Sequence, residues 1–191
     1  MPTQSDRIVI LARQPYPIFH TRDLARLWNI KNLNTLYTLL KRYTKKGILF
    51  RIYKGLYSLV QPKNLDPMLL GTKALHGYAY ISTETILVEK GIITQIIHNY
   101  TLVSDCSRRF RIGQHSFVSR QLDDKFLYNT AGIIEENGIM KATMERAVAD
   151  MLYFNPKAYF DGMNLINFNK VRALQKEIGY PLTSISHVTS A

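Results

Sequence analysis

The fold is decided by residues 33–45, LNTLYTLLKRYTK. At 100° per residue, an α-helix over this stretch places Leu33, Leu36, Leu39, Leu40 and Tyr43 on one apolar stripe. The opposite face carries amide, hydroxyl and cationic side chains, and Gly47 follows where a helix would end. The stretch therefore predicts an amphipathic helix with an outward face rich in hydrogen-bonding groups and positive charge.

Positive charge is concentrated around this helix. Residues 1–62 contain eleven Lys or Arg residues and two acidic ones, a net charge of +9 within a chain of net charge +11. A solvated helix face normally alternates charges of both signs, whereas this one carries cations alone. An excess confined to a third of the chain indicates an anionic partner for that third.

Two helices are expected before the charged helix and a hairpin after it. Apolar residues in 4–13 recur at helical spacing, and the prolines that follow end that segment. A second short helix opens with Thr21 as its N-cap, and the turn 29–32 leads to the third helix. Residues 48–53 and 56–60 are β-rich runs around a glycine-containing turn. This order predicts a winged helix-turn-helix in residues 1–62.

Duplex DNA is the partner that this arrangement predicts, because a recognition helix meets base edges with its first residues and phosphates with its cations. Base contacts are expected from Asn34, Thr35 and Thr38, since Asn can pair bidentately with adenine. The residues expected on phosphates, on the flanking strand or at the wing are Lys31, Asn32, Lys41, Arg42, Lys45, Arg22, Arg51, Tyr53 and Lys54.

The remainder of the chain is expected to form a mixed domain over residues 63–191. Asp66 and Pro67 are suited to the N-cap and first position of a helix and lie at the predicted boundary. β-rich runs follow at 100–104, 109–112 and 116–120, and Asn137-Gly138 predicts a second hairpin. Helices are expected after Thr143 and over 169–178. The whole chain is thus predicted to be a two-domain α+β protein.

Several segments together resemble one known family, the AbiEi-type antitoxins of abortive-infection systems. In the first domain these are residues 19–25 (FHTRDLA), 46–49 (KGIL) and 53–59 (YKGLYSL). In the second they are residues 80–87 (YISTETIL), 90–92 (KGI) and 141–152 (KATMERAVADML). The family usually has Pro where this chain has Met144, which removes some preorganisation of the helix start.

The resemblance implies a DNA-binding antitoxin of a type IV toxin–antitoxin phage-defence operon. The winged helix would repress its own operon at promoter inverted repeats. The C-terminal domain would oppose a nucleotidyltransferase-like toxin, without a stable complex between the two proteins. The matched segments of the second domain are typical of fold determinants, so no functional residue is carried over there. A conventional transcription regulator, whose second domain binds a ligand or dimerises, is the alternative.

An enzyme is not expected. Asp105 followed by Asp123-Asp124-Lys125 resembles the metal-binding core of restriction-type nucleases, but a strand end and a polar loop explain these residues more simply. The five histidines are scattered without metal-ligand spacing, and no glycine-rich phosphate loop occurs. We therefore expect no cofactor and no metal.

Two features bear on location and on a second charged patch. The sequence has no apolar run of bilayer length and begins without a secretory signal pattern, and its single cysteine suits a reducing compartment. A cytoplasmic protein without a membrane partner is the expectation. Four arginines in the β-rich region leave open a second nucleic-acid contact: Arg108, Arg109, Arg111 and Arg120.

Overall fold

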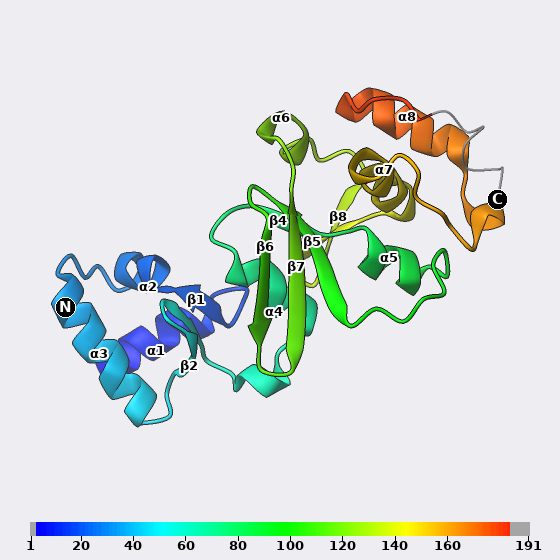
Figure 1. Ribbon diagram of the computed structural model, residues 1–191. Helices are drawn as coiled ribbons and strands as arrows, with labels where there is room; N and C mark the ends of the chain where they lie inside the picture. The colour runs from blue at the N-terminus through cyan, green and yellow to red at the C-terminus, as the bar shows by residue number, and fades with distance from the viewer. Residues whose placement is uncertain (1–2, 184–191) are drawn as a thin grey trace. The chain divides into compact units, whose positions relative to one another are not determined.

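The computed structural model describes residues 3–183. The chain divides into two compact units, Met1–His76 and Gly77–Ala191. Both contain helices and strands, so the α+β class predicted from the sequence is confirmed. Figure 1 shows the elements of each unit with the labels used below.

The first unit consists of helices packed with a small sheet. Three strands form an antiparallel sheet in the order β1-β3-β2. The hydrophobic core of the unit is one contiguous cluster, in which Trp28, Leu36 and Tyr43 are fully buried. The elements are α1 (Gln4–Ala12), β1 (Ile18–His20), α2 (Thr21–Leu27), α3 (Leu33–Lys45), β2 (Phe50–Tyr53), β3 (Leu56–Ser58), the 3-10 turn η1 (Pro62–Asn64) and α4 (Pro67–Ala74).

Helix α3 has the predicted bounds, and its local chemistry explains them. The Asn32 side-chain oxygen accepts hydrogen bonds from the backbone N–H groups of Asn34 and Thr35 at 2.9 and 3.2 Å. This capping satisfies two of the donors that a helix start leaves free. At the other end Gly47 adopts φ +69°, a left-handed conformation that favours glycine.

The start of α2 differs from the prediction. Thr21 is the first helical residue rather than the N-cap, a position that His20 occupies. The reason is tertiary: the Thr21 hydroxyl donates to the carbonyl of Gly55 at 3.2 Å and so ties the helix to the β2–β3 hairpin. The backbone N–H of His20 instead donates to the Asp23 carboxylate at 2.9 Å.

The division between the units lies at 76/77, whereas the sequence placed the boundary at 62/63. Residues 63–76 belong with the first unit because α4 packs against β1. The Tyr53 hydroxyl also donates to the carbonyl of Ala74, and the ring centroids of His20 and His76 lie 4.2 Å apart. Contacts between residues so far apart in the chain cannot be predicted from a local sequence pattern.

The second unit is built on a six-stranded sheet in the order β6-β7-β5-β4-β9-β8. Strands β5 and β7 pair in parallel, as do β4 and β9, and the other neighbours are antiparallel. The Asn137-Gly138 hairpin is confirmed between β8 and β9. The strands are β4 (Ala79–Ile81), β5 (Asn99–Ser104), β6 (Arg108–Ile112), β7 (His115–Gln121), β8 (Ile133–Glu136) and β9 (Ile139–Ala142).

Helices complete the second unit, and α8 lies alongside α7 (Figure 1). Thr143 caps α7 as predicted, since its hydroxyl accepts from the Arg146 N–H at 3.2 Å. The helical elements are α5 (Glu84–Glu89), α6 (Asp124–Leu127), α7 (Met144–Phe154), the 3-10 turn η2 (Met163–Leu165) and α8 (Phe168–Ile178).

A buried ion pair ties this unit together. The Nε atom of Arg146 donates to Asp150 at 2.8 Å, one helical turn along α7, and both side chains are fully buried. The same carboxylate accepts hydroxyl hydrogen bonds from Tyr80, Ser82 and Tyr180 at 3.1, 2.7 and 2.8 Å. The network therefore links α7 to β4, to Ser82 directly after that strand and to Tyr180, two residues beyond the end of α8, which indicates a role in stability.

Candidate nucleic-acid interface

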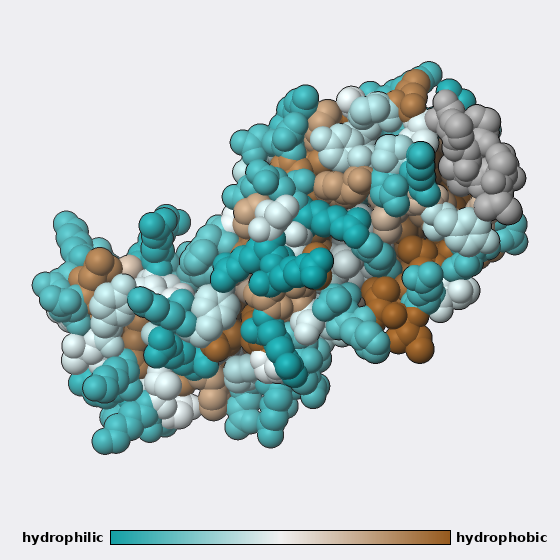
Figure 2. All heavy atoms as spheres, viewed as in Figure 1, coloured by the Kyte–Doolittle hydropathy of each residue, from teal (hydrophilic) through white to brown (hydrophobic). Residues whose placement is uncertain are grey.

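The candidate interface is the outward face of α3 together with the β2–β3 hairpin. Leu36, Leu39, Leu40 and Tyr43 are buried, which turns the opposite side of the helix to solvent. Lys41 and Lys45 are exposed on that side, and Arg51 and Lys54 are exposed on the hairpin. Figure 2 shows mostly hydrophilic groups over the first unit, with white and brown groups between them.

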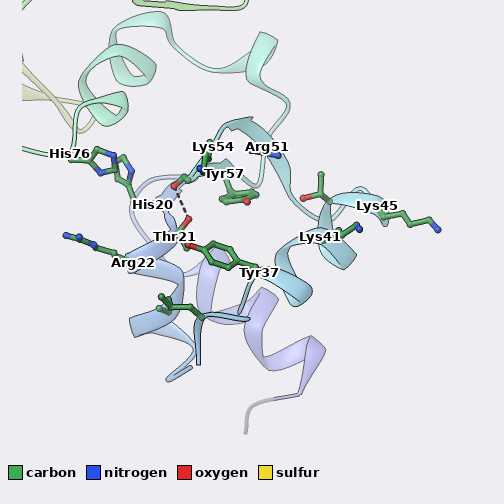
Figure 3. A pocket seen from close by; sticks show the side chains of 14 residues that line it. His20, Thr21, Arg22, Tyr37, Lys41, Lys45, Arg51, Lys54, Tyr57 and His76 are labelled. Carbon is green, nitrogen blue, oxygen red and sulfur yellow. Dashed lines mark hydrogen bonds between the residues drawn. The ribbon is translucent and has the colours of Figure 1, made fainter. Parts of the chain in front are cut away.

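A groove of about 1210 Å³ runs between α3, the start of α2 and the β2–β3 hairpin. Figure 3 shows Tyr37 pointing into it from α3, between Thr21 and Tyr57, while Lys45 extends outward. Among the described residues that line the groove, five are Lys or Arg and none is acidic. These cations are Arg22, Lys41, Lys45, Arg51 and Lys54.

A second, smaller depression of about 440 Å³ lies on the other side of α3. Asn34, Thr35, Thr38 and Arg42 line it, together with Arg7 and two apolar residues. The residues predicted on α3 are therefore split between two sides of one exposed face. Both sides of α3 carry exposed polar or cationic side chains.

Most of the predicted contact residues are exposed, and the local bonds of some of them limit what they can offer. The Thr38 hydroxyl donates to the Asn34 carbonyl at 2.8 Å, so its oxygen is left to accept. The side-chain oxygen of Asn32 accepts the hydrogen bonds that cap α3, so a partner could be bound only through the N–H groups of its side-chain amide. The exposed residues are Arg22, Lys31, Asn32, Asn34, Thr35, Thr38, Lys41, Arg42, Lys45, Arg51 and Lys54.

Tyr53 is the exception among the predicted contacts. Its side chain is half-buried, and its hydroxyl donates to the carbonyl of Ala74 within the same unit. The Tyr53 hydroxyl is thus bound to α4, while Tyr53 itself ends β2 next to the turn, and its contact with DNA stays a prediction. Lys54 and Gly55 form the turn, with Gly55 at φ +91°.

Two residues of α3 line the groove although neither was predicted to contact a partner. Leu33, placed on the apolar stripe in the sequence, is 55% exposed, and Tyr37 is 52% exposed. Leu33 lies at the edge of the stripe and in the first position of the helix, where the core of the unit does not reach it. Its place at the edge of the stripe, in the first turn of the helix, is the sequence feature that could have indicated that Leu33 is exposed.

A histidine pair borders the groove. His20 is half-buried and its ring lies against that of His76, which is exposed. Burial disfavours the charged imidazolium and lowers the pKa of His20, and the neighbouring His76 lowers it further. His20 is therefore biased toward its neutral form in the unbound protein.

The four arginines of the β-rich region do not form one free patch. Arg120 pairs with Glu84, and its guanidinium lies 5.6 Å from the ring centroid of Phe154. The other three are exposed on the edge strand β6, where charged side chains hinder pairing with another chain. Arg109 and Arg111 lie on one face of that strand, and Arg108 lies on the other.

Asp105 and Asp123, the carboxylates considered for a nuclease, follow the carboxyl ends of two neighbouring strands, β5 and β7. Because β5 and β7 are parallel and Ser104 is opposite Gln121, Asp105 and Asp123 follow neighbouring strand ends. Among residues 3–183, no group of three or more His, Cys, Asp or Glu side chains is placed to hold a metal ion.

None of the helices described in the structure is long and apolar enough to cross a bilayer.

Comparison with known proteins finds a similar fold but no matching family. No family model matches the sequence, and no curated protein matches it either. Among solved structures, the chain is similar to the crystal structure of the RV2827C protein from Mycobacterium tuberculosis. The identity is 13% and the TM-score 0.51, over 95% of this chain and 73% of that protein. At this identity the likeness concerns the fold alone, and it supports the α+β architecture.

Proposed function

We propose that the first unit is a winged helix-turn-helix that binds duplex DNA. The observation that carries this proposal is the groove between α3 and the β2–β3 hairpin, whose described lining contains five cations and no acidic side chain. Helix α2, the turn before α3 and the hairpin after it stand in the order that such domains use. In this proposal α3 is the recognition helix and the hairpin is the wing.

Each set of residues has a distinct role in the proposed complex. The cations along the groove neutralise phosphates, which supplies affinity without sequence preference. Asn34, near the start of α3, is exposed and suited to pair with adenine. If about six phosphates are contacted, the logarithm of the binding constant falls with the logarithm of salt concentration at a slope of about −5.

Binding to DNA from the promoter region of the chain's own gene tests this proposal. Fluorescence anisotropy over a series of salt concentrations should give the slope stated above. Lys41→Ala should weaken binding to all sequences alike and reduce the magnitude of the slope by about 1. Lys63→Ala is the matched control, because Lys63 is an exposed lysine of the same unit outside the groove. Equal losses for the two variants would contradict the proposed interface.

Asn34→Ala tests base recognition separately. Its expected effect is a change of sequence preference, with a loss on the promoter duplex that exceeds the loss on random DNA. An equal loss on both duplexes would show that Asn34 contributes no base-specific contact.

We further propose, on the resemblance to AbiEi-type antitoxins, that the chain is a cytoplasmic autorepressor and antitoxin. It would oppose a nucleotidyltransferase-like toxin through residues of the second unit and would itself not be an enzyme. Co-expression with such a toxin from the neighbouring gene, scored by growth, tests this role. Rescue that survives deletion of residues 77–191 would refute the assignment of antitoxin activity to the second unit.

A further inference from the structure

Two large apolar side chains stand exposed in the middle of a cationic surface. Leu33 is 55% exposed and Tyr37 is 52% exposed, and both line the groove beside Lys41. They are four residues apart on α3, so they lie on the same side of the helix, one turn from each other. Figure 3 shows Tyr37 directed into the groove. An occupant that offers both negative charge and an apolar group would be complementary to this groove.

Duplex DNA has one apolar group on its base edges. In the major groove every base pair presents hydrogen-bond donors and acceptors, and thymine alone adds a C5-methyl group. The Leu33 side chain has no hydrogen-bonding atom and cannot read those donors and acceptors. As the first residue of α3, it stands where a recognition helix meets base edges.

The uncharged polar residues in the first half of α3 do not line the groove that holds this apolar pair. Thr35, Thr38 and Arg42 line the depression on the other side of the helix. A duplex lying against the groove side thus meets Leu33 and Tyr37 first, with Lys41 and Lys45 beside them to hold phosphates. Burying a methyl group against a leucine removes apolar surface of both partners from water, which favours thymine at that position.

We propose that Leu33 and Tyr37 determine specificity by contacting the C5-methyl group of thymine in the major groove. This inference rests on the proposed DNA-binding function and adds the base that the groove side of α3 reads. Leu33 packs against the methyl group. The Tyr37 ring, one helical turn further along the same side of α3, packs against the same methyl group.

The experiment compares thymine with uracil, which lacks only the methyl group. The full-length protein first selects its preferred site from a random duplex library, and the selected duplex is then made with deoxyuridine at each thymine in turn. Fluorescence anisotropy should show binding about four-fold weaker at one or two positions, the loss expected for one buried methyl group. Leu33→Ala should bind the thymine and uracil duplexes equally at those positions.

Two further variants make the result specific to the groove. Tyr37→Ala should also reduce the difference between thymine and uracil. Val9→Ala should keep it in full, because Val9 is an exposed apolar residue of α1 that does not line the groove. Circular dichroism should show that each variant is folded, because all three substituted side chains are exposed.

The outcomes separate this inference from the proposed function. If the wild-type protein binds DNA but treats thymine and uracil alike, the inference is wrong and the DNA-binding function stands. Discrimination retained in both Leu33→Ala and Tyr37→Ala would also overturn it. If the wild-type protein binds neither the promoter nor any selected duplex, the proposed function fails. A dimer in the absence of DNA that Leu33→Ala dissociates would show that a second copy occupies the groove instead.

Discussion

Arg146→Met is expected to be one of the most destabilising single substitutions in the second unit. It removes one half of a fully buried ion pair and leaves the Asp150 carboxylate in the interior with only hydroxyl donors. It also removes the donor that binds the carbonyls of Asn129 and Ala131, each at 2.9 Å. An uncompensated buried charge and two unsatisfied carbonyls act in the same direction.

The magnitude follows from the burial of both partners. Breaking a buried ion pair by removing one partner costs about 3–5 kcal/mol of the free energy of unfolding. Most proteins have about 5–15 kcal/mol in total, so the loss is a large share of it. At about 3 °C per kcal/mol for a chain of this length, the melting temperature should fall by roughly 10–15 °C.

Urea unfolding followed by far-UV circular dichroism measures this loss. Lys90→Met is the matched control, because Lys90 pairs with Glu89 at 3.7 Å and both side chains are exposed. An exposed pair contributes about 0–1 kcal/mol, so the control should unfold near the wild-type midpoint. Equal midpoints for Arg146→Met and Lys90→Met would refute the view that the buried network stabilises the unit.

Two further predictions concern the cap of α3 and alkaline pH. Asn32→Ala should lower stability by about 1 kcal/mol, since it removes the side-chain cap of α3; thermal unfolding followed by the fluorescence of buried Trp28 measures this, and an unchanged transition would contradict it. Burial raises the pKa of the Tyr80 and Tyr180 phenols above the ordinary value of 10. The folded protein therefore favours the neutral phenols, and this contribution is complete below about pH 10 and decreases above it as the unfolded chain ionises. Thermal unfolding measured across this range should show the decrease, and Tyr180→Phe should show less of it; an equal decrease in the variant would argue against the assignment.

Much of the local structure could be predicted from the sequence. The bounds of α3, the Thr143 cap and the Asn137-Gly138 hairpin are confirmed as predicted. These features depend on side chains that act on backbone groups a few residues away, so the residue order contains the whole interaction. The ion pair of Arg146 and Asp150 depends on a similarly short spacing, since the two residues are four positions apart on α7.

The candidate site was predicted less completely. The outward face of α3 could be found by periodicity, but its division into two sides could not, because the β2–β3 hairpin and α1 create that division. Leu33 fits an apolar stripe on a helical wheel, yet it is exposed, since it lies outside the apolar core that the described residues of the unit form. The winged-helix assignment, the DNA contacts and the antitoxin role remain predictions for experiment.

The order of residues was enough to specify where most elements begin and end, where positive charge gathers and which α+β class the chain adopts. Folding in three dimensions decided the rest. It assigned residues 63–76 to the first unit, committed the Tyr53 hydroxyl to Ala74 and buried an arginine beneath two tyrosines. The physical reason is distance along the chain: Arg146 and Tyr80 are 66 positions apart, and only the packed structure brings such groups into contact.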